Sequence, residues 1–116
     1  MKSEDIEKAK RFVIVEILEY IPHAVLSTTI LNKTTGTVSV VSFDSGEGLT
    51  ERSSPFDTFI QVIDGIAEIV IDGVSTMLNV GQGIVIPAHA RNAIKSAGQF
   101  KVISTIIKSG YETLPI

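Results

Sequence analysis

The chain has 116 residues, of which 44% are hydrophobic, and a formal net charge of −3 from ten basic and thirteen acidic side chains. This length fits one domain with one core, so we expect residues 1–116 to form a single unit. The mild, interspersed charge argues against a nucleic-acid partner. The lack of cysteine excludes disulfides, thiolate metal sites and a cysteine nucleophile.

The sequence predicts a soluble, cytoplasmic protein without a membrane partner. Its first residues, MKSEDIEKAKRF, are charged and lack the apolar core of a signal peptide. No apolar run approaches the roughly 18 residues that a bilayer-spanning helix needs. The absence of cysteine agrees with a reducing compartment.

The N-terminal region predicts a short helix followed by a strand. Residues 3–10 favour a helix because Ser3 can cap it, acidic residues occupy its first turn and lysines its last. A helix this short must dock on the body of the protein to persist. Residues 11–21, RFVIVEILEYI, predict a strand that is apolar on both faces apart from Glu16 and Glu19, so we expect it to be covered twice.

The rest of the chain predicts short strands separated by turns. The two Asp-Gly pairs, at positions 64–65 and 72–73, are strong turn signals, and residues 32–36 form another turn. The expected strands are 24–31, 37–43, 56–63, 66–71, 74–80, 83–87, 91–96 and 99–109. This pattern predicts an all-β sandwich or barrel without a linker or internal repeat.

Two segments resemble the motifs of the cupin superfamily, in its small single-domain bacterial form with a conserved barrel. Residues 46–65, GEGLTERSSPFDTFIQVIDG, resemble the first motif, and residues 81–94, GQGIVIPAHARNAI, resemble the second. The match covers about residues 35–108, including the framework of Gly65, Asp72, Gly73, Gly81, Gly83 and Pro87. The resemblance implies a double-stranded β-helix, or jelly-roll barrel, whose two antiparallel sheets enclose a pocket.

The metal-ligand positions of the resemblance hold other residues here. Metal-binding members carry two histidines and a glutamate in the first motif and a third histidine in the second. Those positions correspond to Arg52, Ser54, Thr58 and Asn92. Guanidinium has no lone pair to donate and would repel the ion, while neutral oxygens are weak donors for such a metal. We therefore expect no metal and no other cofactor.

The two histidines of the chain both fall in predicted turns. His23 follows a proline near the N-terminus, and His89 lies in the PAHA turn of the second motif. We interpret both as surface residues. A two-histidine site remains an alternative if the N-terminal strand crosses the barrel mouth, and so does acid–base work by His89 with Asp57.

Strand alternation predicts which residues line the barrel. If Thr58 faces inward, Ile60 and Val62 do so too, while Phe59, Gln61 and Ile63 face outward. By the same reasoning Asn92 and Ile94 share the inner face, and Phe43 lines the wall. The expected ligand-binding residues are Arg52, Ser54, Thr58, Asn92, Phe43 and Ile60, a mainly apolar set with a few polar groups.

Arg52 is the group with strong directional chemistry in this set, and two interpretations stay open. It either faces the barrel, where its fork can bind a carboxylate or phosphate, or pairs at the surface with Glu51 or Asp57. Such an exposed pair contributes roughly 0–1 kcal/mol. The sequence thus favours a metal-free protein that binds a small apolar or anionic ligand. The alternatives are a metal-free isomerase or lyase and a non-catalytic interaction module.

Apolar residues on the outer face predict a homodimer. The outward set is expected to include Phe59, Ile63, Ile69 and Ile71, which is more apolar surface than a small monomer usually exposes. A second subunit could also cover the N-terminal strand. Two-fold dimers are the commonest closed assemblies.

Overall fold

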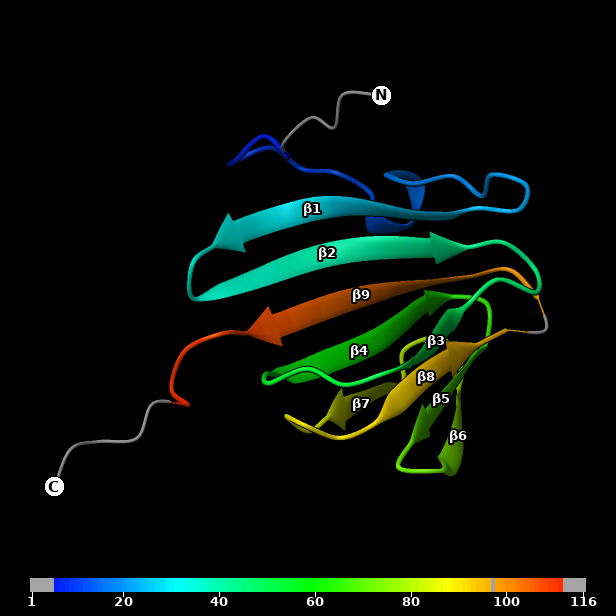
Figure 1. The fold of residues 1–116 in the computed structure, drawn as a ribbon. Helices are drawn as coiled ribbons and strands as arrows, with labels where there is room; N and C mark the ends of the chain where they lie inside the picture. The colour runs from blue at the N-terminus through cyan, green and yellow to red at the C-terminus, as the bar shows by residue number, and fades with distance from the viewer. Residues whose placement is uncertain (1–5, 97, 112–116) are drawn as a thin grey trace, which may run out of the picture.

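Two antiparallel β-sheets face each other in the computed structural model, which describes residues 6–96 and 98–111 (Figure 1). The larger sheet has the order β1-β2-β9-β4-β7 and the smaller one β3-β8-β5-β6. The strands are β1 (Val25–Lys33), β2 (Gly36–Phe43), β3 (Leu49–Arg52), β4 (Asp57–Asp64), β5 (Ala67–Ile71), β6 (Val74–Leu78), β7 (Gly83–Ile86), β8 (Asn92–Lys95) and β9 (Phe100–Ile107). This arrangement confirms the predicted jelly roll.

The core lies between the two sheets and follows the predicted alternation. Ile60 and Val62 of β4 are buried, whereas Phe59 between them is 41% exposed. The rings of Phe43 and Phe100 stack at the centre, with centroids 4.3 Å apart. Both rings are fully buried, so this pair joins β2 and β9 through the core.

The predictions for the N-terminal region are wrong. Residues 6–10 form a turn in which Ala9 has a φ of 64°, so the helix expected over 3–10 is not present there; residues 3–5 lie outside the described part. Residues 11–21 form no strand and contain only a short 3₁₀ turn, η1 (Ile14–Glu16).

The N-terminal segment instead covers the larger sheet on the side away from the core. The Ser42 hydroxyl donates a hydrogen bond to the Glu19 carbonyl at 3.0 Å, and Lys101 Nζ donates one to the Val15 carbonyl at 2.5 Å. Tyr20 donates to Asp64 at 2.5 Å, and burial together with this carboxylate raises the pKa of Tyr20. The segment therefore lies over the sheet rather than extending it, with Leu18 buried and Phe12, Val13 and Ile21 still exposed.

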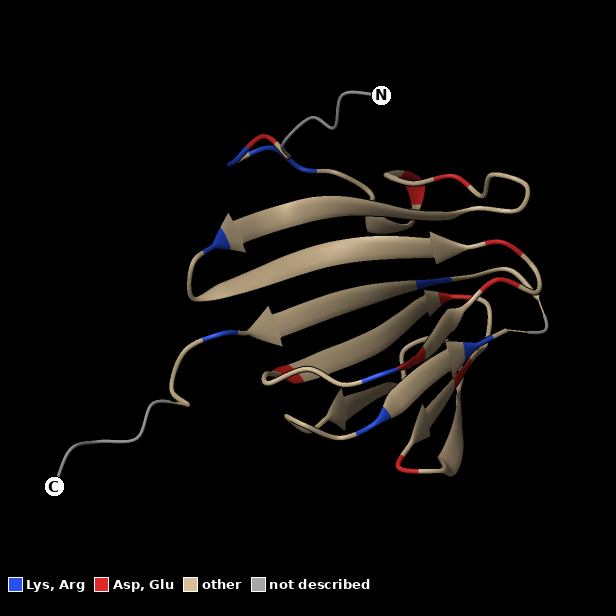
Figure 2. Ribbon diagram, in the orientation of Figure 1, with Lys and Arg blue, Asp and Glu red and all other residues tan. Residues whose placement is uncertain are grey.

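Charged residues lie mainly near strand ends and in connecting loops, as Figure 2 shows for the larger sheet. The short strand β3, which the sequence did not reveal, is paired with β8 at only two positions, Leu49 with Ile94 and Arg52 with Asn92. Within the described residues, no helix is both long and apolar enough to cross a membrane.

Candidate functional site

A cavity of about 280 Å³ opens between the two sheets. It is lined by Arg52, Ser53, Ser54, Phe56, Thr58, Ile86, Pro87, Asn92, Ser104 and Ile106. The structure thus brings together Arg52, Ser54, Thr58 and Asn92, four of the six residues expected at a ligand site. The cavity volume of about 280 Å³ lies just below the usual range for small-molecule sites, about 300–1,000 Å³.

The two sheets give the cavity two different walls. The smaller sheet supplies Arg52 and Asn92, which lie directly opposite each other on β3 and β8. The larger sheet supplies Thr58, which pairs with Ile86 of β7 on one side and Ile106 of β9 on the other. A ligand between the sheets would therefore meet a charged, polar wall and a mainly apolar one.

Arg52 lines the cavity without an ion pair among the described residues. The two carboxylates near it in sequence have other partners: Glu51 pairs with Arg91, and Asp57 accepts a hydrogen bond from the Ala88 amide at 2.7 Å. Although Arg52 is exposed as a whole residue, burial lowers the pKa of its guanidinium. Within the described residues, the N–H donors of the Arg52 guanidinium therefore have no protein partner.

Asn92 is only 6% exposed, and its hydrogen bonds fix the orientation of its amide. Its Nδ2 donates to the carbonyls of Arg52 and Ala90, both at 3.2 Å, which identifies the nitrogen side of the group. Within the described residues, the Oδ1 atom has no hydrogen-bond partner. Every fully buried side-chain polar atom among them does have one, so Oδ1 is not fully buried. Oδ1 therefore keeps some accessible surface, and Asn92 lines the cavity.

The remaining two predicted residues, Phe43 and Ile60, do not line this cavity. They are 0% and 2% exposed and belong to the packed core next to it. Alternation correctly placed them on the inner face, but neighbouring side chains fill the inner positions around Ile60 and toward the end of the sheet where Phe43 pairs with Phe100. Only those near the other end reach open space.

Sequence reasoning missed several residues of the apolar wall and two residues with hydroxyls, Ser53 and Ser104. The alternation of β9 offered a clue, since Phe100, Val102, Ser104 and Ile106 share one face of that strand. A serine in a row of inward apolar residues marks a polar contact site. The adjacent Thr105 and Ile107 obscured this signal, because either set of alternate residues could have faced inward.

The loop after β7 joins the two recognised segments at the cavity. The His89 amide donates to the Ser54 carbonyl at 2.6 Å, and the Ala88 amide is bound to Asp57. The His89 ring has no hydrogen bond to Asp57 in the described part of the chain. The alternative acid–base pair of His89 and Asp57 is therefore not assembled in this structure.

The two histidines lie in different loops. His23 has its amide bound to Asp44 at 2.7 Å, a contact that also lowers the pKa of Asp44. Figure 1 shows the loop before β1 and the loop between β7 and β8 at opposite ends of the molecule. The structure does not form the alternative two-histidine site.

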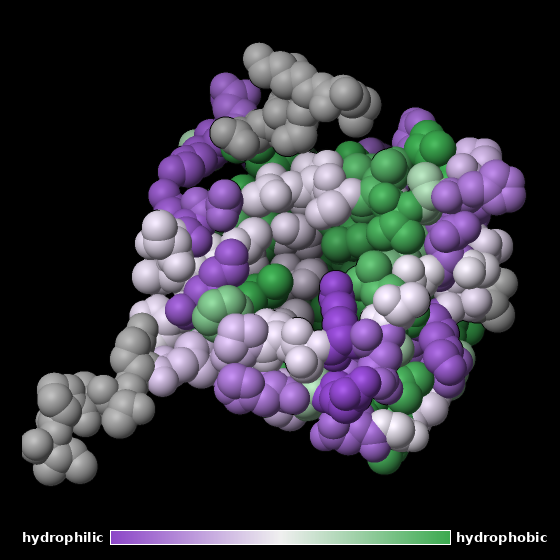
Figure 3. Space-filling model, in the orientation of Figure 1, coloured by the Kyte–Doolittle hydropathy of each residue, from purple (hydrophilic) through white to green (hydrophobic). Residues whose placement is uncertain are grey.

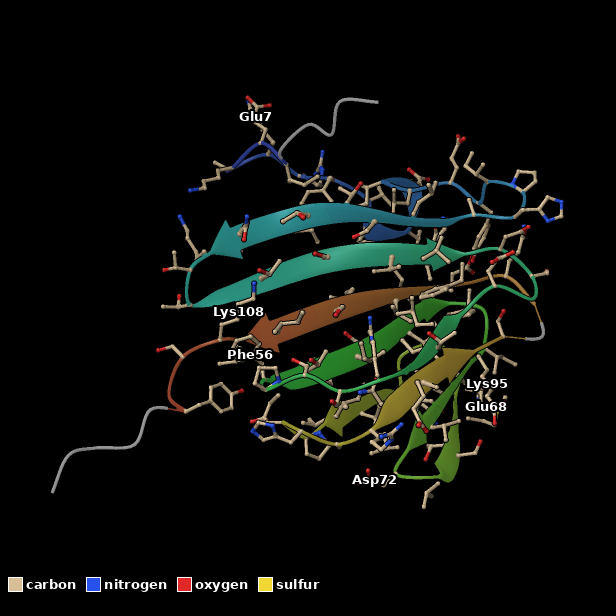
Figure 4. The ribbon with its side chains drawn as sticks, in the orientation of Figure 1. Glu7, Phe56, Glu68, Asp72, Lys95 and Lys108 are labelled. Carbon is tan, nitrogen blue, oxygen red and sulfur yellow. The ribbon has the colours of Figure 1, made fainter. Side chains whose placement is uncertain are left out.

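The C-terminal segment packs against one end of the cavity. Figure 4 shows Phe56 where the chain leaves β9. The Phe56 and Tyr111 rings lie 5.8 Å apart, and the Tyr111 hydroxyl accepts a hydrogen bond from the Asp57 amide at 2.7 Å. These contacts hold the start of β4, and with it the cavity wall, in place.

A second depression, of about 620 Å³, is larger but open to solvent. Val70, Ala93 and Lys95 line it, together with the loop that precedes β3. Its acidic and basic groups are mixed, and Glu51 is already paired with Arg91. The smaller cavity is therefore the better candidate for a specific site.

No family model matches the chain. Protein SchB from Streptomyces halstedii is 32% identical over 76 residues, which span 65% of this chain and only 55% of that protein. A conserved protein of unknown function from Streptococcus pyogenes has a similar structure, with a TM-score of 0.85, 28% identity and coverage of 94% of this chain and 96% of that one. A cupin superfamily protein from Desulfitobacterium hafniense also gives a TM-score of 0.85, at 23% identity, with coverage of 94% and 100%.

The chain has the cupin fold. In this cupin-fold chain the residues that the resemblance aligns with the usual metal ligands do not fit a divalent metal. Arg52 is a cation, and Ser54 Oγ already accepts a hydrogen bond from the Phe56 amide at 3.2 Å. Within the described residues, no three histidine, cysteine, aspartate or glutamate side chains are grouped so that they could hold a metal ion.

Proposed function

We propose that this cupin binds a small ligand with an anionic group in the cavity between its sheets, with Arg52 as the anchor. The observation that carries the proposal is the unpaired Arg52 guanidinium on the cavity wall. Arg52 is exposed enough to meet an entering anion, and the partial burial of its guanidinium would strengthen the ion pair that forms. Its planar fork suits a carboxylate or a phosphate, which can take two parallel hydrogen bonds.

The wall formed mainly by the larger sheet indicates the chemistry of the remaining part of the ligand. Ile86, Ile106 and Phe56 supply apolar surface, and Thr58 supplies a hydroxyl. A short carbon chain attached to the anionic group would cover this wall. The cavity therefore favours a small organic carboxylate over an inorganic anion, which would leave the apolar wall in contact with water.

Arg52→Ala is expected to abolish the stabilisation of the protein by hexanoate. A ligand present at about ten times its Kd stabilises the native state by about 1.4 kcal/mol, which raises the Tm by roughly 5 °C. Thermal denaturation with increasing hexanoate measures the shift, and 1-hexanol provides a neutral ligand of the same length.

Arg91→Ala is the matched control, because Arg91 immediately precedes β8 but pairs with Glu51 and does not line the cavity. This variant should keep the full hexanoate shift. A shift that survives in Arg52→Ala, or an equal shift with 1-hexanol, would show that Arg52 is not the anchor.

We further propose that two copies of the chain associate through the outer face of the larger sheet. Part of the predicted outward set is wrong, since Ile69 is fully buried and Ile71 packs against the core. Phe59 is outward, however, and belongs to a row in register across all five strands. The row consists of Leu31, Val38, Thr105, Phe59 and Val85.

This row carries no charged residue, and three of its members are substantially exposed. Leu31, Phe59 and Val85 are 47%, 41% and 57% exposed. The N-terminal segment covers the other end of the same face, at Ser42 and Lys101. An uncovered apolar face of this kind suits an isologous contact between two identical sheets.

Phe59→Glu is expected to give a monomer where the unmodified protein gives a dimer. The substitution places a charge at the centre of the proposed contact, where two-fold symmetry brings it close to its own copy. Light scattering at micromolar concentration measures the mass. Met77→Glu is the control, since Met77 is 57% exposed on the smaller sheet and should leave the mass unchanged. A monomeric unmodified protein would refute the proposal.

A further inference from the structure

A row of hydroxyl groups leads from the cavity across the inner face of the larger sheet. Ser104 lines the cavity on β9 and pairs in register with Ser39 of β2, which in turn pairs with Thr29 of β1. Residues that pair across neighbouring strands share a face of the sheet. The three hydroxyls therefore form one line that starts at the ligand site.

A second polar row runs beside the first. Thr58 on the cavity wall pairs with Ile106, which pairs with Thr37 of β2, and Thr37 pairs with Asn32 of β1. The Thr37 hydroxyl donates to Asn32 Oδ1 at 3.2 Å. In this second row Ile106 interrupts the polar groups on β9, and they resume on β2 and β1 beside the first row.

The hydroxyls of the first row have no protein partners. Within the described residues, Thr29, Ser39 and Ser104 make no side-chain hydrogen bond, and all three are half-buried. Figure 3 shows this side of the molecule hollowed over β2 and β9, with side chains of intermediate hydropathy gathered over β1 and β2. The row is therefore an accessible, unused set of donors and acceptors.

The chemistry of the row differs from that of the apolar wall in the cavity. A hydroxyl can donate and accept one hydrogen bond at the same time, so it matches another hydroxyl particularly well. An alkyl chain laid over the row would displace water from these groups without replacing its hydrogen bonds. Two strand spacings of about 4.8 Å separate the ends of the row, so a ligand that follows it extends beyond the cavity.

We propose that the inner face of β1 and β2 extends the site and that the ligand is a polyhydroxylated carboxylate. This inference rests on the proposed anionic ligand at Arg52. The carboxylate binds the Arg52 guanidinium, and the adjacent hydroxyl of the ligand donates to Asn92 Oδ1. The remaining hydroxyls bind along Ser104, Ser39 and Thr29.

Three six-carbon probes separate these contributions. D-Gluconate carries both the carboxylate and the hydroxyls, hexanoate carries only the carboxylate, and D-glucitol carries only hydroxyls. Titration calorimetry with the unmodified protein should show gluconate binding roughly tenfold more tightly than hexanoate, and glucitol more weakly than gluconate. The combined substitution Thr29→Val and Ser39→Ala should weaken gluconate severalfold and leave hexanoate unchanged.

Thr28→Val is the matched control. Thr28 pairs with Val40 and faces the opposite side of the same strand, so its loss should not change gluconate binding. Hexanoate binding as tightly as gluconate, equal effects of the Thr28 and Thr29 changes, or no gluconate binding at millimolar concentration would each overturn the hydroxyl row. If hexanoate still depends on Arg52 in those cases, the anionic site stands. Gluconate binding that is unaffected by Arg52→Ala would overturn the anionic site, and with it this inference.

Discussion

Phe43→Ala is expected to lower the free energy of unfolding by about 3–5 kcal/mol, the usual cost of truncating a buried phenylalanine. Phe43 is fully buried, and its ring stacks on Phe100 with an angle of 8° between the planes. The substitution removes this contact and leaves a void that the two sheets can close only partly. Urea denaturation followed by circular dichroism measures the loss.

Phe59→Ala is the comparison, because it removes the same side chain from an exposed position. The Phe59 ring is 41% exposed and lies over Gly83, so its truncation should cost clearly less. Phe43→Ala should also leave the Arg52-dependent hexanoate shift intact, measured relative to its own lower Tm. Loss of that shift with little loss of stability would mean that Phe43 contacts the ligand after all.

Most strands could be predicted because local patterns specify them. The Asp72-Gly73 turn closes the β5–β6 hairpin, and alternation along β4 correctly separates Ile60 from Phe59. Residues 11–21 carry the same apolar, β-branched composition but cover a sheet from outside. Composition alone does not distinguish a segment that pairs as a strand from one that lies, partly exposed, over the face of a sheet. Strand β3 is too short and too weakly paired to leave a pattern.

The residues of the candidate site could be predicted from the sequence, but their contacts with distant parts of the chain could not. The resemblance located Arg52, Ser54, Thr58 and Asn92, and the structure brings them to one cavity. Glu51 pairs with Arg91, 40 positions away in the sequence, while its neighbour Arg52 lines the cavity. The hydroxyl row depends on register across β1, β2 and β9. Such long-range pairings are set by the fold as a whole.

Gly65→Ala is expected to cost about 2–5 kcal/mol of stability, although the same change at Gly73 should cost only about 1–2 kcal/mol. Both glycines follow an aspartate, and both have a positive φ, 72° and 82°. An L-residue is strained in that conformation, which accounts for the cost at Gly73, where an added Cβ would meet nothing within 4 Å.

At Gly65 an added Cβ would lie 2.2 Å from the Gln99 carbonyl oxygen and 2.9 Å from Phe100 Cα. Both neighbours are backbone atoms, so the clash can be relieved only by moving the start of β9. That movement would disturb the stack of Phe100 on Phe43, so the extra cost reports how tightly the core is coupled to this turn, which connects the two sheets. Thermal denaturation of the two variants side by side gives the difference directly. Equal losses at Gly65 and Gly73 would show that only backbone conformation matters at these turns and that β9 can shift without disturbing the core.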